Sequence, residues 1–394
     1  MAPQSDRTRL IAGATRRGRG RRPVNPPIER ASTLLNDSAA LMRDPGPGPV
    51  YGIEDLGAAG ELRSALSDLE GARWTGLVPS GLAAVTVPVT ALTRPGDEVL
   101  TTDAVYGPSR RFLTRHLAAR GVTSRFHQAT ASTEAVIAAL TDRTRVLLIE
   151  SPASLTFDVQ DVAALAAACR ARGGLTVMDN TWGAGLAFRP LAHGVDVSVQ
   201  AVTKYVGGHS DLLMGSIAVA DPAVGRPIAE TLEDLGWRVS PDDAWLALRG
   251  LRTLPLRYGE QGRSALRVAE WLQARPEVAR VLYPPLPGSP GHALWRRDYD
   301  GAASILGVVL NGGTPASADA LLDSLTLFGL GFSWGGFESL ITHETSQLAW
   351  RQAPPTLAGP LLRLHIGLED PVELIADLEQ GLDRFGTGRR LCYR

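Results

Sequence analysis

Short apolar runs that end in a polar residue alternate with helical patterns through the middle of the chain. The apolar runs cover residues 98–102, 145–150, 175–179 and 195–202. Helical patterns lie between them, for example over 109–120 and from the capping residue Asp161 to near Gly173. Such alternation predicts an α/β fold, a mostly parallel sheet with helices on both faces. The uncharged stretch 74–93 contains Gly and Pro, and it predicts a buried turn and helix rather than a membrane span.

The two ends of the chain have a different character. Residues 1 to about 50 are rich in Arg, Pro and Gly and predict an extended arm and loop. After about Gly250 the sequence shows a long helical pattern, Pro-rich turns over 283–290 and shorter strands. We therefore expect an N-terminal arm over 1–55, a large sheet domain over 56–248 and a smaller α+β domain over 249–394.

Composition narrows the classes of partner. The 394 residues are 44% hydrophobic with a formal net charge of -1, which argues against nucleic acid as a partner. An arginine cluster over 16–22 lacks interleaved aromatic residues and is interpreted as a solvated arm. The two cysteines are far apart, and the N-terminus lacks an apolar secretory segment. These features predict a cytoplasmic protein with no membrane partner.

Lysine is almost absent from the sequence. Of the 40 lysine and arginine residues, Lys204 is the single lysine and the other 39 are arginines. Arginine cannot replace lysine where the nitrogen must lose its proton and attack a carbonyl, as in Schiff-base formation. The alternative is drift between two interchangeable surface cations. The neighbours of Lys204 favour the chemical interpretation.

Several other positions predict a site around this lysine. Asp179 ends a predicted strand, and Lys204 follows 25 residues later after another apolar strand, so both are expected at one crevice beyond the sheet. Ser80, Gly81 and Leu82 open a helix whose N–H groups suit a phosphate.

Three further features could belong to a ligand-binding site. Tyr106 follows a strand end and could stack on a flat ring, although it could also fill core. Arg363 offers a fork for a carboxylate, with a surface ion pair as the ordinary alternative. The loop 333–339, with Ser333 and Trp334, is typical of a pocket wall.

Other chemistries find no support in the sequence. His343-Glu344 has Gln347 where a zinc-binding helix needs its second histidine. His209, Ser210 and Asp211 are adjacent and cannot align as a catalytic triad. No nucleophile elbow, P-loop or dinucleotide fingerprint occurs.

Taken together, these residues resemble the Cys/Met-metabolism family of pyridoxal-phosphate enzymes of fold type I. The resemblance covers nearly the whole chain and is closest to the β-lyase branch. Its most specific stretches are residues 150–157, 179–182, 200–211, 333–339 and 363–369. It implies a seven-stranded sheet domain that binds the cofactor, a smaller C-terminal domain, and a homo-oligomer that is at least a dimer, with the tetramer as the usual state of the family.

The resemblance also implies residue roles. Lys204 would hold pyridoxal 5'-phosphate and then take the Cα proton, Asp179 would pair with the pyridine nitrogen, and Tyr106 would stack on the ring and assist catalysis. The phosphate ligands would be Ser80, Gly81, Leu82, Thr203 and, from the neighbouring subunit, Tyr51. The amino-acid substrate would contact Arg363, Ser333, Trp334 and Ser154.

The expected reaction is cleavage of cystathionine or a related S-substituted cysteine to a thiol, pyruvate and ammonia. One segment departs from the family: Tyr51 is present, but Ile53 replaces an arginine that contacts the phosphate, and the acids Glu54 and Asp55 follow. This loss should cost about 1.5 to 3 kcal/mol, roughly ten- to a hundredfold in cofactor affinity.

Two explanations of that departure remain open. The site could be retuned for another substrate, or an arginine from 16–22 or Arg43 could reach the phosphate instead. The alternatives to β-lyase activity are therefore γ-lyase, γ-synthase or a specialised elimination or replacement, and a non-catalytic relative.

Overall fold

A computed structural model describes residues 5–12, 23–52, 54 and 56–391 of the chain. Its larger sheet has seven strands in the order β1-β7-β6-β5-β4-β2-β3. The strands are β1 (Trp74–Val78), β2 (Glu98–Thr102), β3 (Thr123–His127), β4 (Thr144–Glu150), β5 (Leu175–Asp179), β6 (Val197–Gln200) and β7 (Gly215–Val219). β7 pairs antiparallel with both β1 and β6, and the remaining pairs are parallel. The predicted mostly parallel α/β sheet is confirmed.

The residue pattern of β4 shows how the sheet is buried. Val146 and Leu148 join the core on one face, whereas Leu147 and Ile149 join the core on the other. A strand that is apolar on both faces must be covered by helices on both sides. The helices of this part are α3 (Gly57–Glu70), α4 (Gly81–Leu92), α5 (Gly107–Arg111), the π-helix η1 (Phe112–Leu117), α6 (Thr133–Ala139), α7 (Val162–Arg170), η2 (Pro190–His193) and α8 (Pro222–Asp234).

The prediction for the stretch 74–93 was half right. Ser80 caps α4 as expected of a turn that opens a helix, but 74–78 form β1 at the sheet edge. Four of the five β1 residues are buried. A short apolar run carries no period that separates a buried strand from a buried turn, so the pairing partner β7 decided the outcome. The predicted strand over 195–202 is shorter, at Val197–Gln200.

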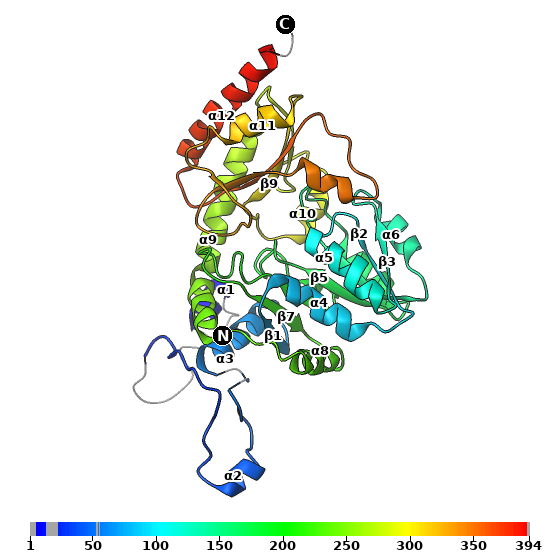
Figure 1. Cartoon of the computed structure of the whole chain (residues 1–394), viewed down its shortest axis with the longest axis vertical. Coiled ribbons are helices and arrows are strands. Elements are labelled where there is room, and N and C mark those ends of the chain that lie inside the picture. Colours follow the sequence, from blue (N-terminus) through cyan, green and yellow to red (C-terminus); the bar gives the residue numbers. More distant parts are fainter. Residues whose placement is uncertain (1–4, 13–22, 53, 55, 392–394) are drawn as a thin grey trace.

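The C-terminal part contains a five-stranded sheet in the order β10-β11-β12-β9-β8. Its strands are β8 (Val278–Leu282), β9 (Ile305–Leu310), β10 (Gly329–Leu330), β11 (Leu340–His343) and β12 (Leu361–His365). Its helices are α9 (Pro241–Gln273), α10 (His292–Asp298), α11 (Pro315–Leu322), η3 (Thr345–Trp350) and α12 (Pro371–Leu391). The boundary predicted after residue 248 falls inside α9, which runs along one side of the molecule and contacts α3 of the larger part as well as β8 and α12 of the C-terminal part (Figure 1).

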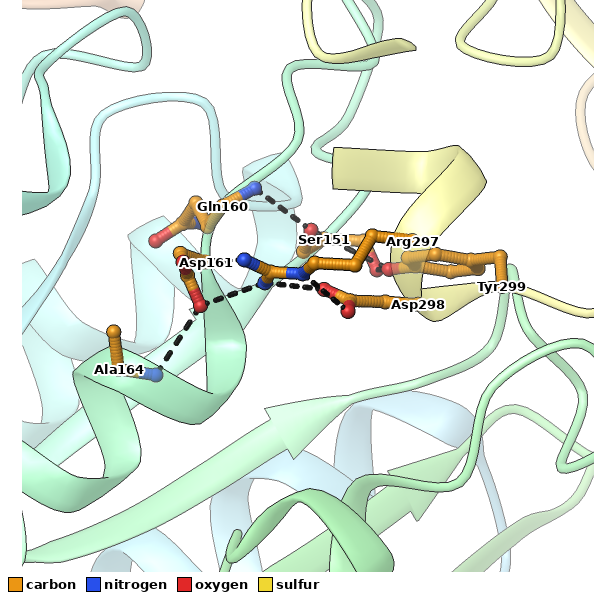
Figure 2. A network of polar contacts seen from close by, with 7 residues as sticks. All are labelled: Ser151, Gln160, Asp161, Ala164, Arg297, Asp298 and Tyr299. Carbon is orange, nitrogen blue, oxygen red and sulfur yellow. Dashed lines mark hydrogen bonds and ion pairs between the residues drawn. The ribbon is translucent and has the colours of Figure 1, made fainter. Parts of the chain in front are cut away.

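Polar side chains tie the two parts together next to the loop that follows β4 (Figure 2). Arg297 of α10 donates to both carboxylate oxygens of Asp161 at 2.9 and 3.0 Å, and Asp161 also caps α7. The Tyr299 hydroxyl donates to the Ser151 carbonyl at 2.8 Å. The backbone N–H of Gln160 donates to the Ser151 hydroxyl at 3.0 Å. The loop 151–160 is thereby fixed at both ends against the C-terminal part.

The N-terminal arm extends away from the body, and its tip carries the short helix α2 (Ala39–Arg43) (Figure 1). A second short helix, α1 (Asp6–Ala12), contacts α9 and α3, so the predicted extended arm contains two short helices. Thr33 bridges Tyr51 across the base of the arm. The arginine cluster over 16–22, Ile53 and Asp55 lie outside the described residues.

Candidate active site

A cavity of about 620 Å³ opens beyond the carboxyl ends of β2, β4 and β5, and loops of the C-terminal part close its other side. Eleven of the twelve predicted site residues line it: Ser80, Gly81, Leu82, Tyr106, Ser154, Asp179, Thr203, Lys204, Ser333, Trp334 and Arg363. Tyr51 does not line it, since it lies on the arm with 52% of its surface exposed. The position beyond the strand ends agrees with the general rule for parallel sheets.

Lys204 lies in the turn after β6 with its amine directed into the cavity. Nζ donates a 2.6 Å hydrogen bond to the Ser333 hydroxyl and lies 5.5 Å from the centre of the Trp334 ring. Burial, together with the nearby charge of Arg363, lowers the pKa of Lys204 to about 8, while Asp179 opposes that shift. A lysine with this pKa has a sizeable neutral fraction near pH 8, which nucleophilic attack on a carbonyl requires.

Asp179 ends β5 and is held by its own loop. Its Oδ1 accepts hydrogen bonds from the Thr181 N–H at 3.0 Å and from the Thr181 hydroxyl at 2.5 Å. The Thr181 hydroxyl in turn accepts from the Ala201 N–H at 2.9 Å. Burial raises the pKa of Asp179, and the Thr181 hydrogen bonds and Lys204 oppose that rise. The arrangement suits a carboxylate that meets a positively charged ring nitrogen.

Glu150 is a second buried carboxyl group that the sequence analysis did not select. It ends β4 directly opposite Asp179 in the sheet register. It accepts hydrogen bonds from the Tyr106 N–H at 2.7 Å and the Ser154 hydroxyl at 2.6 Å. Burial, followed by the charge of Asp179, raises the pKa of Glu150 to about 8. The sequence offered a partial signal, since both acids end predicted strands that are consecutive along the chain.

Tyr106 stands at the beginning of α5, and its side chain lines the cavity while remaining 47% exposed. Burial raises the pKa of the phenol, and Glu150 and Asp179 raise it further. The phenol is therefore neutral at physiological pH. A half-exposed neutral ring beside two carboxyl groups can stack on a flat ligand.

Arg363 lies in the middle of β12 opposite Thr342. Its Nε is 3.5 Å from Oε1 of Glu344, whose side chain is fully buried, and Thr342 donates to the same carboxylate at 2.7 Å. Burial lowers the pKa of Arg363. The pair with Glu344 leaves most of the guanidinium donors for a ligand. Glu344 entered the sequence analysis only in the rejected zinc pattern, because its partner is distant in sequence.

The N-terminus of α4 supplies the part of the cavity that suits an anion. Ser80 caps the helix by accepting from the Ala83 N–H at 3.1 Å, and Ser80, Gly81 and Leu82 at the start of the helix line the cavity. The first N–H groups of a helix have no partner within the helix and suit an anion. A Cβ atom on Gly81 would come within 2.4 Å of the Ala201 Cβ, so only glycine fits there. The Thr203 hydroxyl donates to the Met214 carbonyl at 3.1 Å and must rotate to reach an anion.

The cavity thus combines an amine of lowered pKa, a buried carboxylate, an aromatic ring, a helix N-terminus and an arginine. This set fits a flat, anionic aldehyde cofactor that is carried on a lysine, and it defines a pyridoxal-phosphate enzyme. The comparisons with known proteins specify the family: residues 7–383 match the model for Cys/Met metabolism PLP-dependent enzymes, and the chain belongs to this family. The predicted family, cofactor and enzyme class are confirmed.

The chain is also similar to individual named proteins. A putative cystathionine β-lyase of Rhizobium johnstonii is 42% identical over 362 residues, 91% of each chain. A cystathionine β-lyase of Bordetella avium is 42% identical over 373 residues, 93% of each chain. The solved structure of a cystathionine γ-synthase from Xanthomonas oryzae pv. oryzae, in complex with cystathionine, matches with a TM-score of 0.91 at 30% identity, covering 98% of this chain and 100% of that one.

Proposed function

We propose that the protein is a carbon–sulfur β-lyase that cleaves cystathionine or a related S-substituted cysteine. With one water consumed, the products are the free thiol, pyruvate and ammonia. The observation that carries the proposal is the position of the Lys204 amine, hydrogen-bonded to Ser333 in the cavity that Asp179 and Arg363 also line. The 42% identity to a named β-lyase of Bordetella avium favours this reaction among those of the family.

Pyridoxal phosphate, when bound, supplies an electron-accepting ring that stabilises negative charge at the substrate Cα. Lys204 would hold the cofactor, and its amine would take the substrate Cα proton. Asp179 keeps the ring nitrogen protonated, and Tyr106 stacks on the ring. Arg363, oriented by Glu344, binds the substrate α-carboxylate.

The remaining predicted residues complete the proposed site. At the phosphate end, the N–H groups of Gly81 and Leu82 bind the oxygens, with the Ser80 and Thr203 hydroxyls beside them. At the substrate end, Ser333 orients the Lys204 amine, and Trp334 and Ser154 form the walls.

The proposed assembly is a homo-oligomer in which a partner's arm completes the site, as a dimer or a dimer of dimers. Leu213 and Phe332 line the cavity and are 68% and 78% exposed, which leaves an apolar rim for a second chain to cover. Tyr51, exposed on the arm, would reach the partner's phosphate. We also place the protein in the cytoplasm, because the described Cys169 is a buried free thiol. Among the described residues, no helix is long and apolar enough to span a bilayer.

The competing reaction is γ-elimination or γ-replacement, which the departure at Ile53 and the likeness to a γ-synthase structure motivate. Purified holoenzyme is incubated with cystathionine, and pyruvate and 2-oxobutyrate are quantified separately. Pyruvate as the main product supports the β-lyase, whereas 2-oxobutyrate assigns γ-chemistry. Neither product from any cysteine thioether would overturn the proposal. Borohydride reduction followed by peptide mass analysis should place the cofactor on Lys204.

A further inference from the structure

A second group of guanidinium side chains lines the same cavity and has no role in the reaction proposed above. Arg110 and Arg111 come from α5, and Arg351 follows η3. The helix α5 follows β2, and Arg351 contacts the loop after β4, whereas Arg363 comes from β12 of the C-terminal sheet. Burying a cation without a counter-charge costs free energy, so the groups that these arginines bind must be identified.

Arg351 is fixed by one backbone contact. Its Nη2 donates to the Ser154 carbonyl at 2.8 Å. Burial lowers the pKa of Arg351, and the charge of Arg110 lowers it further, while Asp158, Asp103 and Glu150 oppose the shift. The guanidinium offers five N–H donors, so the contact with Ser154 leaves most of them for a ligand.

Arg110 is fixed in a similar way. Its guanidinium carbon lies 4.1 Å from the centre of the Phe126 ring, and Nη1 makes a long 3.4 Å contact with the Asp103 carbonyl. Stacking on an aromatic ring orients the guanidinium plane without using its N–H donors.

The carboxylates nearby are engaged elsewhere. Asp103 accepts from the backbone N–H groups of Ala129 at 2.9 Å and Ala353 at 3.3 Å. Asp158 accepts from the Thr156 hydroxyl. Glu150 is largely protonated below about pH 8, because burial and Asp179 raise its pKa. Among the described residues, neither Arg110 nor Arg351 makes an ion pair within 4.0 Å.

We propose that Arg110 and Arg351 form a second anion subsite, which binds a carboxylate at the far end of the substrate's thiol arm. The inference deepens the proposed β-lyase function and rests on it. Ser154 links the subsite to the cofactor position, because its hydroxyl donates to Glu150 and its carbonyl accepts from Arg351. In the proposed binding mode, a thioether held at Arg363 by its α-carboxylate extends its other arm toward the subsite. Arg111, which is exposed, adds positive charge at the rim.

The subsite predicts that the enzyme prefers substrates with a carboxylate at the end of the thiol arm. Comparison with an uncharged amide of the same shape tests this preference. Pyruvate release is measured for S-(2-carboxyethyl)-L-cysteine and for S-(2-carbamoylethyl)-L-cysteine, which differ only in carboxylate against amide. We expect kcat/KM to favour the carboxylate by about tenfold or more, since a charge-assisted hydrogen bond is roughly twice as strong as a neutral one. The cationic S-(2-aminoethyl)-L-cysteine should be the poorest of the three.

Variants connect the preference to the two arginines. Arg110→Gln and Arg351→Gln should each reduce the carboxylate-to-amide ratio by about tenfold, mainly through KM. Arg115→Gln is the matched control, because Arg115 lies four residues beyond Arg111, is exposed and does not line the cavity. It should leave the ratio unchanged. Each variant must keep the thermal midpoint and the cofactor absorbance of the wild type.

A wild-type ratio near one, or a ratio that survives both substitutions, overturns the subsite. Failure of the β-lyase assignment looks different, since then neither compound releases pyruvate. In that case calorimetric Kd values of the two compounds for the holoenzyme replace kcat/KM. The same carboxylate preference and the same loss in the two variants would still support the subsite, and equal Kd values would contradict it.

Discussion

The cavity floor and the N-terminal arm place functional residues in opposite ways. The cavity floor consists of Glu150, Asp179, Lys204 and Arg363 with their hydrogen-bonding and ion-pair partners. On the floor, each charged group is buried with a partner from its own chain: Asp179 with Thr181, and Arg363 with Glu344. On the arm, Leu35 is 94% exposed and Tyr51 is 52% exposed. Substitutions are poorly tolerated where side chains are held in place by buried partners. They are better tolerated in an exposed segment that makes few contacts within its own chain. We therefore expect a departure from the family, such as Ile53, to be tolerated more readily on the arm than on the floor.

The largest expected effect is on the floor. Lys204→Ala should reduce turnover by about 10² to 10⁴-fold, the range that general base catalysis contributes, and borohydride should no longer attach the cofactor covalently. Lys204→Arg keeps the charge and should be as inactive, because a guanidinium does not lose its proton. Pyruvate release with excess pyridoxal phosphate measures both variants. Activity retained in the arginine variant would contradict the assigned role.

Ile53→Arg tests the arm. Restoring the arginine should tighten cofactor binding by roughly ten- to a hundredfold, provided that the arm reaches a partner's phosphate. The measurement is the Kd of pyridoxal phosphate for the apoprotein, and Ile53→Gln is the uncharged control. If both variants bind the cofactor like the wild type, then either another arginine already contacts the phosphate or the arm lies elsewhere. Sedimentation of each variant would separate these outcomes.

The sequence predicted the floor better than the surroundings, for a physical reason. Asp179 and Lys204 follow strands, and the parallel-sheet rule alone brings such residues together. The Arg363–Glu344 pair depends on side-chain directions within β12 and the segment after β11, and the edge strand β1 depends on its partner β7. Neither the ion pair nor the pairing of the edge strand can be predicted from the local periodicity of apolar residues. The domain boundaries and the residue roles stay predictions.

An identical substitution on each region sharpens the contrast. Thr181→Val removes a buried hydroxyl that donates to Asp179 and accepts from Ala201, and should lower the free energy of unfolding by about 1 to 3 kcal/mol. Thr33→Val alters an exposed residue at the base of the arm and should change the free energy of unfolding by less than about 0.5 kcal/mol. Urea unfolding of the apoproteins measures both. Equal losses would show that the arm is as tightly held as the floor.

The smallest expected effect is the pH dependence of stability that comes from the Glu150 carboxyl group. Its pKa in the folded state is raised to about 8, so between about pH 4.5 and pH 8 the folded chain keeps a proton that the unfolded chain has released. Stability must therefore fall as pH rises through this window, on the order of 1 kcal/mol per pH unit for one proton. Glu150→Gln mimics the protonated acid, accepting from Tyr106 as before, and should make the fall shallower by that amount.

Glu70, whose pKa burial raises to about 7, contributes the same background to the wild type and the variant, so only the difference between their slopes reports on Glu150. The measurement is the free energy of unfolding of the apoproteins in urea at pH 5, 6.5 and 8. Parallel slopes would mean that Glu150 is ionised in the folded state. The floor would then hold two adjacent negative charges, Glu150 and Asp179, opposite each other in the sheet register. The repulsion between them would have to be offset by Lys204 and Arg363, and the account of the floor as a set of locally paired groups would fail.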